Sequence, residues 1–172
     1  QVTKNPQEYV FTYGRILPSK GIDIAISTAK QMGIPIKFAG PIADQDYMDE
    51  VVMPLLRPCD SYLGHLDHHN IKCQLANAKA AVFGTRWDEP FGLSTLEAMA
   101  TGTPVVSFNR GAFAEIVGEG AGVLAKGNNV NSLAAALEAS FSLNKSDVIK
   151  SARNFPIAKM CSEYSNLLGR IA

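Results

Sequence analysis

The chain has 172 residues, of which 47% are hydrophobic and 19% are charged, and its sixteen basic residues balance its sixteen acidic residues. This composition is that of one globular domain and excludes disordered and fibrous proteins. A net charge of zero provides no bulk field to attract nucleic acid or an anionic membrane, so any anion site must be local. No apolar run reaches the roughly 18 residues of a membrane span, and the first residues lack the plan of a secretory signal, so we expect a soluble, cytoplasmic protein.

Short runs rich in Val, Ile, Phe and Ala alternate with stretches of helical periodicity along the chain. This alternation predicts an α/β fold: a Rossmann-like open parallel sheet with helices on both faces. The predicted elements are, in chain order, strand 8–16, helix 22–32, strand 35–40, helix 45–56, strand 61–66, helix 69–78, strand 80–85, helix 95–101, strand 104–108, helix 112–117, strand 122–125 and helices 130–142 and 157–170.

Open parallel sheets bind ligands outside the carboxyl ends of their strands, where loops and helix N-termini converge. We therefore expect the site to be built from the loops after the predicted strands. These loops are 15–21, 40–45, 64–69, 86–95 and 108–112.

Common phosphate-binding and metal-binding motifs are incomplete in this sequence. The segment 14–21 follows a strand but lacks the Gly-Lys-Ser/Thr ending of a P-loop, and the glycines of 118–122 precede a strand rather than follow one. His65, His68 and His69 lack further ligands at metal-binding spacing, so we predict no metal site and place these imidazoles near a nucleotide base instead. The three cysteines have no C-x-x-C spacing, and we interpret them as small buried or unreactive thiols.

The segment 87–106 has the composition of a ligand-binding loop and helix. Pro90 keeps Glu89 extended, Gly92 lets backbone approach a ligand, and Ser94 or Thr95 begins a helix whose free N–H groups face the crevice. Glu97 lies on the first turn, so two carboxylates flank one helix N-terminus. A capping box between Ser94 and Glu97 is the structural alternative, but it leaves Glu89 unexplained.

The whole chain resembles the C-terminal, donor-binding domain of family 4 retaining glycosyltransferases, which have the two-domain GT-B fold. The resemblance spans about residues 9–170 and includes a Glu-x7-Glu pattern. It is carried by Gly14-Arg15-Ile16-Leu17, Lys20-Gly21-Ile22-Asp23, Phe38-Ala39-Gly40, Tyr62-Leu63-Gly64, residues 89–100, Gly102-Thr103-Pro104-Val105-Val106, Gly111, Glu115-Ile116-Val117 and Gly122.

The resemblance implies a role for each matching residue. Arg15 and Lys20 would hold the diphosphate of a nucleotide sugar and stabilise the leaving group in place of a metal ion, so no cofactor is expected. Glu89 would accept hydrogen bonds from sugar hydroxyls, and Glu97 would bind both ribose hydroxyls. The catalytic set is therefore Arg15, Lys20 and Glu89. The donor-binding set comprises Gly14, then Gly40, Gly64 and the backbone near His65, which would border the base, then the backbone N–H groups of Phe91, Gly92, Leu93 and Ser94, and finally Glu97.

The resemblance also implies an N-terminal acceptor domain that is absent from these 172 residues, which would all belong to the donor-binding domain. The expected partners are a nucleotide sugar and that second domain, with no nucleic acid and with membrane association possible only through the absent half. A storage-polysaccharide synthase, a nucleotide-sugar epimerase and a non-catalytic nucleotide-binding module remain alternatives.

Overall fold

The computed structural model describes residues 8–170, and their strands form one parallel sheet in the order β3-β2-β1-β4-β5-β6. Residue pairs such as Val10–Ile36 and Ala81–Val105 set the register between neighbouring strands. The predicted open parallel sheet is confirmed. The strands are β1 Val10–Tyr13, β2 Ile36–Ala39, β3 Ser61–Tyr62, β4 Ala81–Phe83, β5 Val105–Phe108 and β6 Gly122–Ala125.

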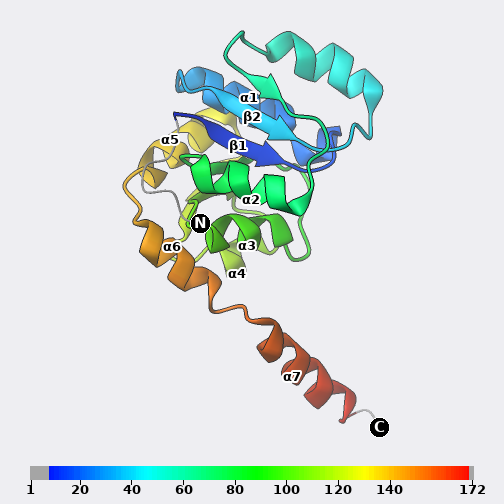
Figure 1. Cartoon of the computed structure of the whole chain (residues 1–172), viewed down its shortest axis with the longest axis vertical. Coiled ribbons are helices and arrows are strands. Elements are labelled where there is room, and N and C mark those ends of the chain that lie inside the picture. Colours follow the sequence, from blue (N-terminus) through cyan, green and yellow to red (C-terminus); the bar gives the residue numbers. More distant parts are fainter. Residues whose placement is uncertain (1–7, 171–172) are drawn as a thin grey trace.

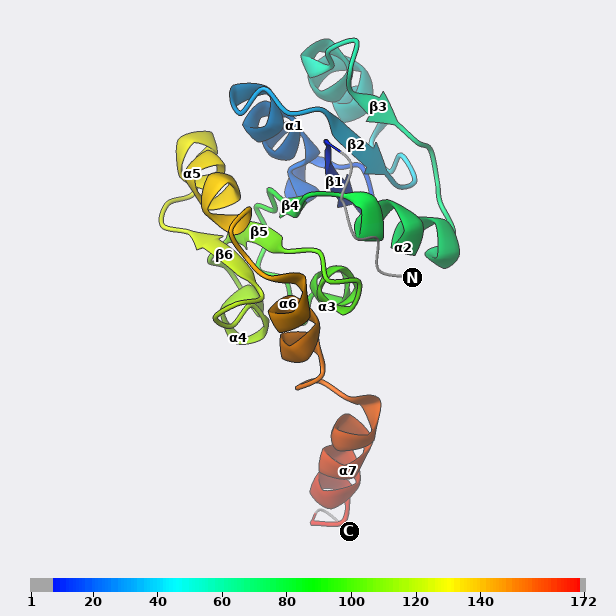
Figure 2. The same cartoon turned by 60° about the vertical axis from the view of Figure 1, so that its left-hand side comes forward.

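Helices cover both faces of this sheet, as predicted (Figures 1 and 2). Alternate strand residues point to opposite faces, so Val10 packs in one buried cluster with α1 and α5, whereas Phe11 packs in a second cluster with α2, α3, α4 and α6. The helices are α1 Ile22–Gln31, α2 His68–Asn77, α3 Leu93–Ala100, α4 Phe113–Ile116, α5 Val130–Ser140, α6 Lys145–Ala152 and α7 Ile157–Leu168.

Several predicted boundaries are wrong. The strand predicted over 8–16 ends at Tyr13, and Ile16 makes only an isolated bridge to Ile42. The strand predicted over 61–66 is reduced to two residues. The helix predicted over 45–56 is irregular: a π-helix, Tyr47–Val52, leads into a 3-10 turn, Met53–Leu55. Pro54 has no N–H to donate, so a regular α-helix cannot continue through it.

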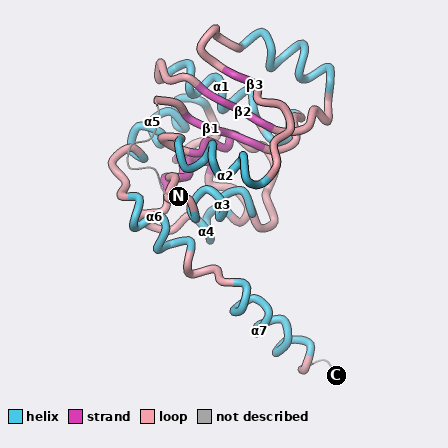
Figure 3. Tube along the Cα trace, viewed as in Figure 1, coloured by secondary structure: helices cyan, strands magenta, loops and turns pink. Residues whose placement is uncertain are grey.

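The C-terminal region differs most from the prediction. Helix α6 was not predicted, and Asn144 caps it by accepting a hydrogen bond from the Ser146 N–H at 2.9 Å. Helix α7 was predicted, but none of its residues is buried and it projects away from the sheet (Figure 3). The cysteines are exposed and form no disulfide, so the expectation that they are buried was wrong, whereas their being unreactive stays a prediction.

Candidate active site

The site lies where the sheet order reverses, between β1 and the neighbouring strand β4. The chain leaves β1 toward β2 on one side and leaves β4 toward β5 on the other, so the loops after β1 and β4 diverge and leave a crevice. A pocket of about 250 Å³ occupies this position. Its lining includes Gly14, Arg15, Lys20, Glu89 and Ser94, all of which were predicted site residues.

An ion pair joins the two loops across the crevice. Lys20, at the end of the 3-10 turn η1 Pro18–Lys20, places its Nζ 2.7 Å from Glu89 Oε2. The side chains are only 24% and 21% exposed. Trp87 Nε1 donates to the same oxygen at 2.8 Å. Arg15 is exposed and makes no salt bridge among residues 8–170, so the site retains an uncompensated cation.

The loop that carries Lys20 is held by residues that sequence reasoning missed. Arg86 donates two hydrogen bonds to the Asp23 carboxylate, at 2.8 and 2.6 Å, and a third to the Pro18 carbonyl at 2.7 Å. Tyr47 also donates to Asp23, at 2.6 Å. Burial raises the pKa of the Asp23 carboxyl, but the hydrogen bonds from Arg86 and Tyr47 outweigh burial and hold this pKa below its ordinary value. The sequence did contain a signal for this contact: Arg86 directly follows a predicted strand, and Asp23 lies at the start of a predicted helix.

The loop that carries Glu89 is held from the other side by the loop after β5. The Ala112 N–H donates to the Glu89 carbonyl at 2.8 Å. A Cβ on Gly111 would lie 2.5 Å from both the backbone nitrogen and the carbonyl oxygen of Glu89, so only glycine fits there. The 108–112 loop, predicted to border the site, therefore supports its backbone.

The N-terminus of α3 lies beside Glu89 and has no side-chain cap. Its N-cap is Gly92, and the helix begins at Leu93, earlier than predicted. Thr95 on the first turn is fully buried, and its Oγ1 has no hydrogen-bond partner in the described part of the chain. An uncapped helix start with a spare hydroxyl suits an anionic oxygen.

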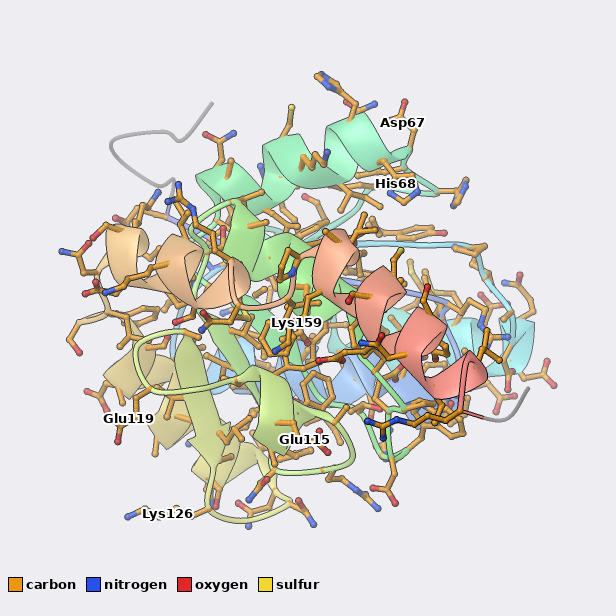
Figure 4. The ribbon with its side chains drawn as sticks, turned by 90° about the horizontal axis from the view of Figure 1, so that it is seen from below. Asp67, His68, Glu115, Glu119, Lys126 and Lys159 are labelled. Atoms are coloured by element: carbon orange, nitrogen blue, oxygen red, sulfur yellow. The ribbon has the colours of Figure 1, made fainter. Side chains whose placement is uncertain are left out.

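Glu97 does not form the capping box that was the alternative interpretation. Its Oε2 accepts a hydrogen bond from the Tyr13 hydroxyl at 2.5 Å, and its Oε1 lies 3.7 Å from His68 Nδ1. Figure 4 shows His68 beside Asp67 at the start of α2. Burial first, and then the hydrogen bond to Glu97, raises the pKa of Tyr13 well above its ordinary value. The glutamate therefore faces a neutral phenol.

The three predicted glycines at the strand ends lie together. The Gly40 N–H donates to the Gly64 carbonyl at 2.9 Å, and a Cβ on Gly40 would lie 1.8 Å from the Gly14 carbonyl oxygen. His65, Phe91 and Leu93 are exposed and do not line the pocket. A role for these last three residues stays a prediction.

Two further findings concern the described residues as a whole. Within residues 8–170, no three His, Cys, Asp or Glu side chains gather as a metal ion would require. Over the same residues, no helix has the length and apolar character needed to cross a bilayer.

A match to a known family identifies the class of protein to which this fold and pocket belong. Residues 1–155 match the family described as glycosyl transferases group 1. The chain belongs to this family.

One relative and two solved structures show how similar the chain is to known proteins. The chain is 35% identical over 139 residues to the glycogen synthase of Mycobacterium tuberculosis, a match that covers 77% of this chain and 33% of that protein. A glycosyltransferase involved in avilamycin A biosynthesis shares the fold at 24% identity and a TM-score of 0.83, over 99% of this chain and 53% of that one. Anabaena HepE, solved in complex with UDP and glucose, shares it at 23% identity and a TM-score of 0.82, over 95% and 48%. The chain thus spans between a third and about half of the length of these proteins.

Proposed function

We propose that the chain is the donor-binding domain of a retaining glycosyltransferase, which transfers a sugar from a nucleotide-diphosphate sugar to an acceptor hydroxyl. The observation that carries this proposal is the contact of Lys20 with Glu89, at 2.7 Å, in a pocket that Arg15 also lines. A side-chain cation that can bind a phosphate and a carboxylate that can accept from a hydroxyl therefore lie side by side in this pocket. The solved complex of HepE with UDP and glucose supports a nucleotide sugar as the ligand class.

Under this proposal, these residues act on the reaction through electrostatic stabilisation. When the bond between the anomeric carbon and the diphosphate oxygen breaks, negative charge develops on the leaving diphosphate. Arg15 and Lys20 stabilise this charge, and the N-terminus of α3 adds hydrogen-bond donors, so the reaction proceeds without a metal ion. Glu89 Oε2 is held by Lys20 and Trp87, which leaves Oε1 to accept a hydrogen bond from a sugar hydroxyl.

The acceptor binds, under this proposal, to a second domain on the N-terminal side of this one. That domain closes the crevice, excludes water and completes the active site. The 172-residue chain by itself therefore binds nucleotides weakly and transfers little or no sugar. Any membrane contact is made by the second domain.

A storage-polysaccharide synthase is the second candidate function, because the identity to glycogen synthase reaches 35%. It differs from the general proposal in its acceptor, which is the non-reducing end of a glucan. Incorporation of labelled glucose into glycogen, by a protein that contains this chain and an acceptor domain, distinguishes it from transfer to other alcohols.

Titration calorimetry of the 172-residue chain with UDP, GDP and ADP tests the donor site. We expect heat from at least one of them, unchanged by EDTA, and weaker binding by Lys20→Met. Arg153→Met is the matched control, because Arg153 is the exposed C-cap residue of α6 and does not line the pocket that contains Lys20. Absence of heat from all three nucleotides would remove the proposal.

A further inference from the structure

Tyr13 lies at the end of β1 and its side chain is fixed by its aromatic neighbours. Its ring stacks on Phe11, with centroids 5.6 Å apart, and meets Phe83 edge-on at 5.9 Å. These contacts leave the ring little rotational freedom and aim its hydroxyl at the first turns of α3. The hydroxyl group is therefore placed before any ligand arrives.

The Tyr13 hydroxyl stands between two acceptors. It is 2.5 Å from Glu97 Oε2 and 3.0 Å from the Ser94 carbonyl oxygen. A phenol carries one proton, and neither neighbour can donate, so the phenol is the donor to both. The shorter distance and the negative charge make Glu97 the stronger acceptor.

We propose that Tyr13 is a positioning residue, which holds Glu97 so that its Oε1 accepts hydrogen bonds from the ribose hydroxyls of the donor nucleotide. This inference rests on the proposed function, because it assigns a role within the same site. It concerns the nucleoside part of the ligand and not the diphosphate or the sugar.

Glu97 has little else to fix it in the described part of the chain. No capping interaction engages it, and its other polar neighbour, His68, is 3.7 Å away with a side chain that is 86% exposed. An exposed imidazole at this distance contributes little order. The contact with Tyr13 therefore removes rotamer freedom from Glu97 in advance, and binding the ribose does not have to remove it.

Glu89 is held in the same manner, which supports this interpretation. Its Oε2 accepts from Lys20 and from Trp87 Nε1, at 2.7 and 2.8 Å. Each glutamate of the Glu-x7-Glu pattern thus has its Oε2 held by the protein and its Oε1 left for a ligand.

The test is Tyr13→Phe, which removes the hydroxyl and keeps the ring. UDP, GDP and ADP are titrated against the chain together with their 2′,3′-dideoxy counterparts and inorganic pyrophosphate. We expect about a tenfold loss of affinity for the ribonucleotide, which corresponds to about 1.4 kcal/mol, with the dideoxy nucleotide and pyrophosphate unaffected. The ratio of ribonucleotide to dideoxynucleotide affinity should approach that of Glu97→Ala.

Tyr9→Phe is the matched control. Tyr9 is buried and donates its hydroxyl to the Gln74 carbonyl at 2.9 Å, so the same atom is lost from a site that does not contact Glu97. This variant should keep the wild-type affinity ratio even where its stability falls. A purely structural role for Tyr13 predicts the same behaviour for Tyr13→Phe.

The outcomes separate the inference from the function on which it rests. If the wild-type chain binds none of the nucleotides, the donor site itself is refuted. If it binds them and Tyr13→Phe keeps the wild-type ratio, only the positioning role is refuted. Should Tyr13→Phe not fold, a 13C label on the tyrosine ζ carbon of the wild-type chain decides. The Tyr13 signal should shift with the ribonucleotide and not with its dideoxy counterpart, and equal shifts would overturn the inference.

Discussion

The bracing of the 15–21 loop by Asp23 can be tested with Asp23→Asn, which keeps the shape of the side chain and removes its charge. The Asp23 side chain is 16% exposed and accepts hydrogen bonds from Arg86 and Tyr47. Asparagine can accept at one oxygen only, so at least one of these donors loses its partner.

The expected loss of stability is about 1–2 kcal/mol. A hydrogen bond to a charged group contributes about 1.5–3 kcal/mol when it is buried, but Arg86 is 43% exposed, so solvent screening reduces the figure. For a chain of this length the loss corresponds to a fall in Tm of about 3–6 °C. Asp88→Asn is the control: Asp88 pairs with Arg110 at 3.2 Å but is 71% exposed, and its loss should cost less than about 0.5 kcal/mol.

Urea unfolding of both variants across pH gives the decisive measurement. The folded pKa of Asp23 lies below its ordinary value, so the carboxylate stabilises the fold at neutral pH and this contribution is lost as pH falls through the folded pKa. The difference between the wild type and Asp23→Asn should be constant near pH 7, and it should shrink below about pH 4. Equal stability at pH 7, or a difference that persists in strong acid, would refute this account of the loop.

Three further predictions concern other parts of the chain. Gly40→Ala should lower the free energy of unfolding in urea by more than about 3 kcal/mol, because its Cβ would lie 1.8 Å from a backbone oxygen. Gly33→Ala, with open space around its Cβ, should lower it by only about 1–2 kcal/mol. Equal losses would contradict the close approach at Gly40. Lys20→Met should weaken nucleoside diphosphate binding at least about tenfold in calorimetry, and wild-type affinity would show that Lys20 does not contact phosphate. Stability should fall as pH rises above about 10, because folding keeps buried phenols neutral and raises their pKa, that of Tyr9 to about 12; a flat urea midpoint between pH 9 and 11 would contradict this.

The fold was predictable where apolar runs and helical periodicity are strong. The short apolar runs of β1, β4 and β5 define the strands, and their nearly continuous burial reflects a sheet covered by helices on both faces. Helix α6 was missed because Val148 is its single fully buried residue, so it has almost no apolar stripe. Pro54 was the visible signal that the 45–56 segment could not be one regular helix.

The candidate site was predictable as a set of residues but not as a set of contacts. Loop position selected Glu89 and the family resemblance selected Lys20, and the structure brings the two side chains within 2.7 Å of each other. The Ser94 to Glu97 spacing suggested a local cap, yet Glu97 bonds to Tyr13, 84 residues away along the chain. Only the sheet order reveals that partner, because it places β1 between β2 and β4, next to the strand that leads into α3. Local spacing cannot report such a neighbour.

The divergence of the chain on either side of β1 and β4 has an evolutionary consequence. Each rim of the crevice belongs to a separate crossover unit, and the rims share no chain segment. They contact each other through the pair Lys20–Glu89 and through the hydrogen bonds of Arg86 to Asp23 and to the Pro18 carbonyl. One rim can therefore acquire insertions or replacements while the opposite rim and the strands beneath keep their hydrogen-bonding register. Exchange of the 87–95 segment between relatives, with Arg86 retained, is thus a practical route to chimaeras with altered ligand preference.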